Sequence, residues 1–455
     1  MDAEFATEWE RNAIEFLQTP VPAEIRDRAA NTVADVLAAT VAGAETPGIR
    51  EVSASESFAD GGASVLGTAR RTHPTQAALL NTAAAIAQEI EEGHNTVGHV
   101  GASIVAGSVG VAEQAGVDGR TFVDACARVY ELCIRLERAI FAMKEKMNEA
   151  LPWLVRDPHS TWTTVGPAMT SALCLGADRQ TLREVFRIAA NLAVVSMHDP
   201  YAEGPPARNF TAGFSAQAGV TAALSGTAGL TGSESAIHVV YDPFEELLEE
   251  GFTAQFRTLG ENWEITEQYL KPYPSCRYTH PPVDALRDAV DGKAVDPDVV
   301  EAITVETFTN AAEMSHASPE TMTGAKFSTP YVLARYLTDG ELTLGQFERD
   351  AVVDTTVQTL ADRVSLSTSP EYERAFPESW GARVRVTLRD GTVLSGERSY
   401  PRGDHRDPLS ETDLEERNRA LLAYGLPESQ VEDGLSVLTS VATQPVRTTV
   451  AQLTS

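Results

Sequence analysis

The sequence predicts a mainly α-helical protein that carries a smaller α+β insert. Apolar residues recur at helical spacing through most of residues 1–264, and several of those segments are apolar nearly all round, as buried bundle helices are. Alternating apolar and polar residues, typical of strands, appear only after about residue 265. A helical pattern returns at DLEERNRALLAYG (413–425). We therefore expect a helical domain over 1–264, an α+β domain over 265–404, and C-terminal helices over 405–455 that return to the helical domain.

The predicted helices of the first domain follow from this periodicity. Their expected ranges are 23–44, 102–116, 121–147, 163–177 and 180–197. An alanine-rich run, TQAALLNTAAAIAQ (75–88), is a further helix by propensity. Gly93 is its expected stop signal, which puts the carboxylates of Glu89, Glu91 and Glu92 in the last helical turn. Carboxylates there face the negative end of the helix dipole, so their position suggests a functional reason.

Two strand signals mark the α+β domain. AITVETFT (302–309) alternates apolar and polar residues. ARVRVTLRDGTVLSGERSY (382–400) contains two alternating runs around Asp-Gly, the strongest short hairpin signal. Helical patterns at 281–290, 327–338 and 344–364 complete an expected βαβ-rich module.

The composition excludes several classes of partner. The 455 residues include 65 acidic and 36 basic side chains, for a net charge of -29, so we expect no binding to nucleic acid or to anionic membrane surfaces. An acid excess with almost no lysine is typical of a halophilic protein, because high salt screens the self-repulsion. The lysines are Lys144, Lys146, Lys271, Lys293 and Lys326.

The cysteines and the hydropathy pattern indicate the compartment. The cysteines lack CxxC spacing and predict no disulfide framework. They are Cys126, Cys133, Cys174 and Cys276. The first residues show no basic leader followed by an apolar core, and no uncharged apolar run of about 18 residues occurs. We expect a soluble, cytoplasmic protein.

The stretch IAQEIEEGHNTVGHVGAS (86–103) concentrates carboxylates and histidines at the predicted end of a helix. Glu89, Glu92, His94 and His99 form either a metal site or a metal-free site for acid–base chemistry and anion binding. The histidine spacing matches neither HExxH nor a paired Cys/His site, so we expect no metal. A structural role, in which the histidines cap the helix and pair with the glutamates, stays open.

Two further segments suggest anion binding. EGPPARNFTAGF (203–214) carries Arg208 from a Gly/Pro loop into a small-residue helix, whose start could present donors to an anion, although tight helix packing explains the same pattern. YLKPYPSCRYTH (269–280) is a rigid, cationic loop at the domain boundary, which suggests a pocket for an acidic small molecule unless its charges are simply exposed. Its notable side chains are Lys271, Cys276, Arg277 and His280.

The segment AKFSTPYVLARYLTDGELT (325–343) predicts an amphipathic helix opened by Ser/Thr-Pro. Tyr331 lies at the start of that helix. Its side chain is either a phenolic acid or a core aromatic, and the pattern favours neither.

These four segments, in this order, resemble the MmgE/PrpD family. The resemblance covers nearly the whole chain and includes GLTG (229–232) and PRGDHRDPLS (401–410). It implies a homodimer in which each chain has an all-helical domain and an α+β lid, and a chemistry that needs no metal or organic cofactor. That chemistry forms or quenches a carbanion next to a carboxylate, as in 2-methylcitrate dehydratase, cis-aconitate decarboxylase and iminodisuccinate epimerase.

The resemblance assigns family positions to three residues of the 86–103 stretch. The first acidic position of the family falls on Glu89, and its threonine position falls on Gly93. The histidine of its His-Pro motif falls on His99, with Val100 in place of the proline.

Three further family positions lie in the other segments. Arg208 stands where the decarboxylase-like members have lysine, and Cys276 stands where the decarboxylase has histidine. Tyr331 matches the tyrosine of the lid helix. Because arginine stays protonated and does not readily exchange protons, these departures make cis-aconitate decarboxylation a less expected reaction.

We therefore expect a hydro-lyase that acts on a small polycarboxylate such as 2-methylcitrate. The expected catalytic residues are His99, Tyr331, Glu89, Arg208 and Lys271, with His99 and Tyr331 transferring protons. The expected substrate-binding residues are Gly93, His94, Cys276, Arg277 and His280. The alternatives are an epimerase or racemase of an imino- or amino-dicarboxylate, a cis-aconitate-type decarboxylase, and a catalytically silent polycarboxylate-binding protein.

Overall fold

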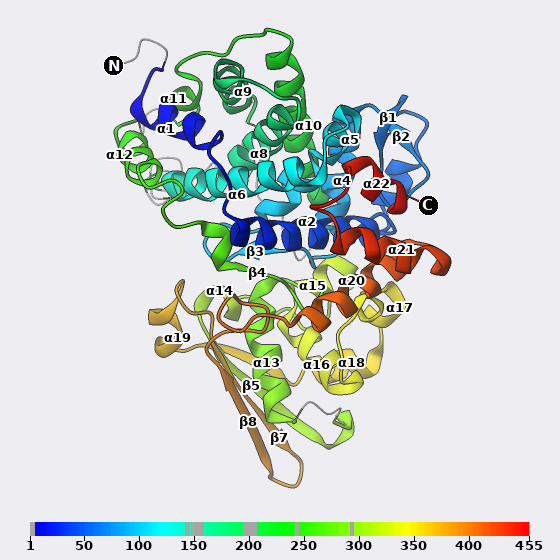
Figure 1. The fold of residues 1–455 in the computed structure, drawn as a ribbon. Helices are drawn as coiled ribbons and strands as arrows, with labels where there is room; N and C mark the ends of the chain where they lie inside the picture. Colours follow the sequence, from blue (N-terminus) through cyan, green and yellow to red (C-terminus); the bar gives the residue numbers. More distant parts are fainter. Residues whose placement is uncertain are drawn as a thin grey trace.

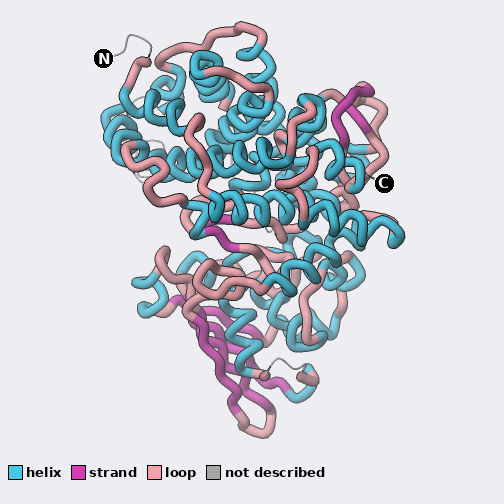
Figure 2. Tube along the Cα trace, in the orientation of Figure 1, coloured by secondary structure: helices cyan, strands magenta, loops and turns pink. Residues whose placement is uncertain are grey.

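The computed structural model describes residues 5–141, 146, 149, 159–193, 207–241, 245–291 and 295–454 of the chain. The helices of the first half form a large helical domain, and a smaller α+β domain lies against it (Figures 1 and 2). The predicted fold class, a mainly helical protein with an α+β insert, is confirmed. Among the described residues, no helix is long and apolar enough to cross a membrane.

The helical domain packs its helices around one large apolar core. Its helices are α1 (Glu8–Phe16), α2 (Ala23–Gly43), α3 (Ile49–Ser53), α4 (Pro74–Ala87), α5 (Val109–Ala115), α6 (Gly119–Phe141), α8 (His159–Cys174), α9 (Arg179–Leu192), α10 (Ala207–Thr227), α11 (Ala236–Tyr241), α12 (Glu245–Phe256), α20 (Glu411–Gly425), α21 (Glu428–Thr439) and α22 (Val446–Gln452). A π-helical turn, η1 (Ala102–Ala106), precedes α5, and a 3₁₀ turn, η3 (Glu264–Glu267), ends the domain. Strands β1 (Asp60–Ser64) and β2 (Arg71–Thr72) form a small antiparallel pair.

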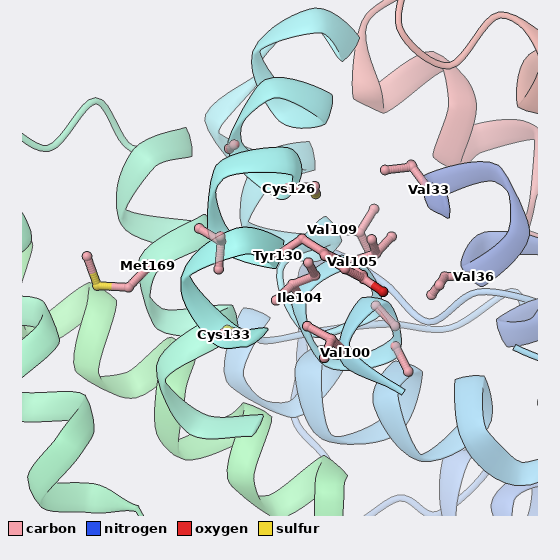
Figure 3. Close-up of a cluster of buried hydrophobic side chains, with 14 of the residues drawn as sticks. Val33, Val36, Val100, Ile104, Val105, Val109, Cys126, Tyr130, Cys133 and Met169 are labelled. Carbon is pink, nitrogen blue, oxygen red and sulfur yellow. The ribbon is translucent and has the colours of Figure 1, made fainter. Parts of the chain in front are cut away.

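Side chains from both ends of the chain build this core. Leu421 and Leu422 of α20 are buried in the same apolar cluster as Val36 and Leu37 of α2. Cys126 and Cys133 lie among valine, isoleucine and methionine side chains of the cluster, as Figure 3 shows, and both are free thiols. These two cysteines therefore act as small buried apolar residues.

The α+β domain has its own core around one four-stranded sheet. Its elements are η4 (Arg277–Thr279), α13 (His280–Ala289), η5 (Pro297–Val299), β5 (Val300–Thr307), α14 (Thr309–Ala312), α15 (Met322–Lys326), α16 (Thr329–Asp339), η6 (Leu344–Phe347), α17 (Arg349–Val352), α18 (Thr355–Ala361), β6 (Val364–Thr368), α19 (Pro370–Ala375), β7 (Ala382–Leu388) and β8 (Val393–Arg398). The strand order is β6-β5-β7-β8, with β5 and β6 parallel and the other pairs antiparallel. The β7–β8 hairpin turns at the predicted Asp-Gly, where Gly391 has a φ of 85°.

Two short strands join two of the predicted site segments between the helical domain and the α+β domain. β3 (Gly93–His94) pairs antiparallel with β4 (Gln268–Tyr269), so that Gly93 lies opposite Tyr269 (Figure 1). The loop after His94 leads to His99, and the loop after Tyr269 leads to Lys271. This pairing brings together two segments that are about 180 residues apart along the chain.

The structure corrects the predicted end of the alanine-rich helix. α4 ends at Ala87, so Glu89, Glu91 and Glu92 lie in the loop after it and not in its last turn, and Gly93 belongs to β3. The cause is tertiary: in a longer helix the Glu92 N–H would bond the Gln88 carbonyl. Instead the Glu92 N–H donates to Asp35 Oδ2 at 2.8 Å, and the Gln88 carbonyl accepts from Lys326 at 2.7 Å.

Two other predicted helices differ from the observed ones. The 344–364 stretch is divided into η6, α17 and α18, because the Asp354 carboxylate accepts from the Thr356 N–H and starts a new helix there. The stretch 102–116 begins as the π-helical turn η1. Most residues of 142–147 and all of 194–197, which end two predicted helices, lie outside the described residues.

Candidate active site

The buried carboxylate of Glu89 lies between two cations at the junction of the two domains. Its Oε1 accepts from Arg208 Nη1 at 2.8 Å, and its Oε2 accepts from Lys271 Nζ at 3.2 Å. Lys271 Nζ also donates to the Glu89 carbonyl at 3.0 Å. Burial by itself opposes ionisation of Glu89, but the charges of Lys271 and Arg208 outweigh it and hold the pKa of this carboxyl well below its usual 4.5. Glu89 is therefore ionised in the folded protein.

The backbone of Glu89 adopts a conformation that its residue type rarely takes. Its φ is 51°, and among the described non-glycine residues only Asp291 shares a positive φ. A left-handed backbone costs free energy at a residue with a Cβ, and such strain clusters at functional sites. The two contacts from Lys271 keep Glu89 in this conformation.

His99 lies beside this carboxylate with its two ring nitrogens in different surroundings. Nδ1 is 3.0 Å from the Glu92 carbonyl and 3.2 Å from Glu91 Oε1, and Nε2 is 4.0 Å from Glu89 Oε2. Because a carbonyl only accepts, Nδ1 carries the proton and Nε2 is left with a lone pair. Burial, helped by the charge of Lys271, lowers the pKa of His99 to about 3, so its ring is neutral. The side chain is 28% exposed and can meet a ligand.

Glu91 is a buried acid that the site residues predicted from sequence did not include. Both of its carboxylate oxygens are buried and accept no hydrogen bond from the described part of the chain. Burial, together with the negative charge of Glu89, raises the pKa of Glu91 to about 7 in spite of Lys271. A carboxyl that keeps its proton in this range can donate it, and Glu91 Oε1 lies next to His99 Nδ1.

The raised pKa of Glu91 predicts a pH dependence of stability. Between pH 4.5 and about 7 the folded chain holds a proton that the unfolded chain has released, so this contribution is complete below pH 4.5 and is lost as the pH rises through about 7. We expect the unfolding free energy of Glu91→Gln, relative to the wild type, to increase by up to about 3 kcal/mol over this range. Urea unfolding at several pH values in molar KCl measures it. Parallel pH curves for the two proteins would contradict the assignment.

The cationic loop places one thiol and one guanidinium near this cluster. Burial raises the pKa of Cys276 to about 12, so its side chain is a neutral thiol. The Arg277 guanidinium lies over the Tyr269 ring at 4.3 Å, and its Nη1 donates to the Arg402 carbonyl at 3.0 Å. Its Nε and Nη2 are buried and donate no hydrogen bond to the described residues, and the nearest carboxylate oxygen, on Asp404, is 4.0 Å from Nη2.

The other two predicted histidines differ from His99 in their partners. His280 is fully buried, with Nε2 3.2 Å from the Ser275 carbonyl and Nδ1 3.2 Å from Arg277 Nη1, so both ring nitrogens are engaged. His94 is buried with Nε2 3.6 Å from Glu264 Oε2, and burial lowers its pKa to about 3. Two neutral, enclosed rings are poor ligands for a substrate carboxylate.

The sequence predicted that Tyr331 meets His99, and the structure places the Tyr331 side chain in the core of the α+β domain. The Tyr331 hydroxyl donates to the Gln346 carbonyl and lies 3.4 Å from Arg335 Nε, and its ring packs on Phe347 in the core of the α+β domain. It forms no hydrogen bond with the Glu89 cluster within the described ranges. This agrees with the reading of Tyr331 as a core aromatic, because its proton already has an acceptor inside the domain.

The segment before Tyr331 reaches the cluster instead, and sequence reasoning missed it. Lys326 Nζ donates to the carbonyl of Gln88 at 2.7 Å and to its Oε1 at 2.5 Å. The Phe327 ring lies 4.9 Å from the Arg208 guanidinium carbon. The signal was present in the composition, since a chain with five lysines that draws attention to Lys271 draws it equally to Lys326.

Gly93 is a position where the structure has no room for a side chain. A Cβ built on Gly93 would lie 2.3 Å from the Tyr269 hydroxyl and 2.4 Å from its ring carbon Cζ. Tyr269 is itself 2% exposed and cannot easily withdraw. The tyrosine ring therefore fills the space beside the position where the family resemblance implies a threonine.

We expect Gly93→Ala to destabilise the fold by about 1–3 kcal/mol through overpacking against Tyr269. The double variant Gly93→Ala/Tyr269→Leu is expected to recover part of this loss, because the shorter side chain frees the space. Gly345→Ala is the matched control, since its Cβ meets only Thr343 Oγ1 at 3.8 Å. Urea midpoints measure all three, and equal midpoints for the Gly93 and Gly345 variants would contradict the packing argument.

Among the described residues, two groups of side chains could bring ligand atoms together for a metal ion. In Glu89, Glu91 and His99, and again in His94, Glu264 and Glu267, the donor atoms lie within 4.8 Å of one another. Lys271 and Arg208 already neutralise Glu89, and Arg135 and Arg138 already contact Glu264. A divalent cation in either group would lie beside two positive side chains, so neither donor set suits a metal.

The fold and the site together define a class: a mainly helical protein with an α+β domain and a buried, charged cluster at the junction of the two. The MmgE/PrpD N-terminal domain model matches residues 13–256, and the MmgE/PrpD C-terminal domain model matches residues 273–441. The chain belongs to the MmgE/PrpD family.

Named relatives of the chain are lyases. It is similar to a cis-aconitate decarboxylase-like protein of Aspergillus oryzae, with 25% identity over 92% of this chain and 90% of that protein. It is similar to a cis-aconitate decarboxylase of Aspergillus terreus, with 24% identity over 93% and 91%. The human cis-aconitate decarboxylase is 26% identical over 62% of this chain and 59% of its own length. These matches support a lyase-like role for the chain.

Proposed function

We propose that this chain is a metal-free lyase that removes water from a small polycarboxylate of the 2-methylcitrate type. The observation that carries the proposal is the pairing, at one buried cluster, of a neutral histidine with an acid that keeps its proton near neutral pH. His99 Nε2 offers a lone pair, and Glu91 lies 3.2 Å from the other nitrogen of the same ring. Dehydration next to a carboxylate needs a base for the carbon-bound proton and an acid for the leaving hydroxyl.

The carboxylate anchor of this proposal is Arg277 rather than Arg208 or Lys271. Arg208 and Lys271 already hold Glu89, so a substrate carboxylate would have to compete with a buried one. Arg277 has two buried nitrogens without a hydrogen bond among the described residues and no carboxylate closer than 4.0 Å. An under-paired buried guanidinium is a strong site for a planar carboxylate.

We expect Arg277→Lys to raise the KM for a polycarboxylate about 10- to 100-fold, because the bidentate contact is lost. Arg419→Lys is the control, since Arg419 is 37% exposed and pairs with Glu415 and Glu432 on the surface. Steady-state kinetics in molar KCl measure both variants. An unchanged KM for the Arg277 variant would remove this anchor from the proposal.

A second candidate reaction is decarboxylation of cis-aconitate, which the names of the relatives favour. The two reactions share a carbanion or enolate next to a carboxylate and differ in what leaves. In this chain the thiol of Cys276 lies near Glu89 and Lys271. Burial raises its pKa to about 12, so it keeps its proton at neutral pH. A thiol with that pKa is a weak proton donor for a carbanion at neutral pH, which favours dehydration.

The test is incubation with a panel of di- and tricarboxylates in molar KCl, followed by mass spectrometry. Loss of water from 2-methylcitrate supports the proposal, and loss of carbon dioxide from cis-aconitate supports the second candidate. Exchange of solvent deuterium without alkene formation would replace both with an epimerase. Thermal stabilisation by polycarboxylates without any product would contradict a lyase and indicate a binding protein. A parallel assay at low salt tests the expected halophilic behaviour.

A further inference from the structure

Lys326 is a buried cation at the end of α15 that has no acidic partner in contact. Its side chain is 1% exposed, and within the described residues no carboxylate lies within 4.0 Å of its Nζ. Nζ donates to the carbonyl and to Oε1 of Gln88, and the ring of Phe347 lies 5.6 Å away. A buried ammonium without a counter-ion is costly, and its neutral amine form is much less so.

The neighbouring lysine makes the contrast clear. Lys271 Nζ donates to the Glu89 carbonyl, and Lys326 Nζ donates to the Gln88 carbonyl. The two amino groups are therefore bound to successive carbonyls of the chain. Lys271 has the Glu89 carboxylate as a direct partner, and Lys326 has none. When two cations lie this close, the one without a counter-ion gives up its proton first.

The charges around Lys326 agree with this geometry. Burial lowers the pKa of Lys326 to about 7, the negative charges of Glu89 and Glu91 oppose that shift, and the positive charge of Lys271 adds to it. The other group near the amine is the uncharged aromatic ring of Phe347, from the same domain. The amine therefore lies in the range where a proton is both held and released near neutral pH.

The main chain of Lys326 ties this group to the rest of the site. Its carbonyl accepts from the Cys276 N–H at 2.9 Å, and the next residue, Phe327, packs against Arg208. Lys271 and Glu89 are 0% and 3% exposed, whereas the His99 side chain is 28% exposed, so a substrate that meets His99 reaches the edge of this buried cluster. These contacts place Lys326 in the same group of side chains as Cys276, Arg208 and the residue before Glu89.

We propose that Lys326, rather than Glu91, gives the proton to the leaving group, a role that rests on the proposed lyase function. Glu91 lies beside His99 Nδ1, where its part is to support the base. His99 Nε2 accepts the proton as the C–H bond next to the carboxylate breaks, and the electron pair moves into the substrate. As the C–O bond breaks, that pair forms the C=C bond, and the Lys326 ammonium gives its proton to the departing hydroxyl, which leaves as water. His99 then releases its proton to solvent and the amine regains one, so the site returns to its starting state and the cycle needs no oxidant, reductant or other reactant.

Lysine-selective NMR of the whole protein tests the titration directly, because the chain has only five lysines. We expect one side-chain signal to titrate near pH 7 in the wild type and to vanish in Lys326→Arg. Lys146→Arg, at an exposed position outside the site, removes a different signal and leaves the titration in place. A spectrum in which every lysine titrates above about pH 9 would overturn the proposal.

Kinetics test the catalytic role. We expect the kcat of the wild type to fall as the pH rises above about 7, because the acid must be protonated. In Lys326→Arg we expect kcat to be reduced at least about 100-fold and this falling limb of the pH profile to be absent. Lys326→Gln gives the same result without a charge, and urea unfolding verifies that both variants are folded. Wild-type kcat and an unchanged limb in the arginine variant would overturn the role of Lys326 alone. Absence of turnover by the wild type on any polycarboxylate would overturn the proposed function and the acid role with it.

Discussion

We expect Glu89→Ala to lower the free energy of unfolding by about 3–5 kcal/mol and to abolish activity. The variant leaves Lys271 fully buried and Arg208 largely buried without the carboxylate that neutralises them. Breaking a buried ion pair from one side costs far more than the pair contributes, because an uncompensated charge remains in the interior. Urea unfolding in molar KCl at constant pH measures the loss.

A double-mutant cycle isolates this effect from the lost volume of the side chain. Glu89→Ala/Lys271→Met removes both charges, and we expect it to be more stable than the sum of the two single variants predicts. Glu371→Ala is the control, since its side chain is 62% exposed beside Arg383 and its loss should change stability little. Additive losses across the cycle would mean that the Glu89–Lys271 contact contributes nothing in particular.

The second large effect is expected for His99→Asn, which should reduce kcat/KM about 100- to 10,000-fold while the fold remains stable. The asparagine amide can still donate to the Glu92 carbonyl as His99 Nδ1 does, so the loop keeps its contact. The variant lacks only the atom at the Nε2 position, which faces Glu89 at 4.0 Å. Steady-state kinetics on the best polycarboxylate of the panel measure the loss of kcat/KM. Unfolding curves for the wild type and the variant measure whether stability is retained.

Tyr331→Phe is the matched comparison for His99→Asn. The structure gives the Tyr331 hydroxyl a partner in the Gln346 carbonyl, so we expect this variant to lose some stability and to keep most of its activity. If Tyr331→Phe lost activity as severely as His99→Asn, the role predicted for Tyr331 from the sequence would stand. Near-wild-type turnover by His99→Asn would instead remove His99 from the mechanism.

Much of the architecture could be predicted from local patterns. The Asp-Gly hairpin forms β7 and β8, and AITVETFT forms most of β5, because alternation and turn residues act over a few positions. The helical periodicity likewise placed α2, α6 and α9 within a few residues, apart from ends that lie outside the described residues. The strand β6 was missed because it follows directly on a helical pattern, and its pairing with β5 is a contact across about 60 residues.

The sequence predicted part of the site. The errors in that prediction come from contacts between distant segments, which a local pattern does not show. The meeting of Glu89, His99, Arg208 and Lys271 was expected from the family resemblance, and the structure places the four in contact. The helix end was wrong, since Asp35 and Lys326 take the bonds that would have continued α4. Lys326 was overlooked because no motif around it distinguishes a buried lysine from an exposed one.

The sequence by itself determined the mainly helical fold, the α+β insert and the segments that build the site, because these follow from periodicity, turn chemistry and composition along the chain. Only the tertiary structure decided which charges neutralise one another, which histidine stays exposed enough to meet a ligand, and which lysine lies buried without a counter-ion. The physical reason is that protonation depends on burial and on the nearest charges, and at this site directly paired charges such as Lys271 and Glu89 lie 182 positions apart along the chain.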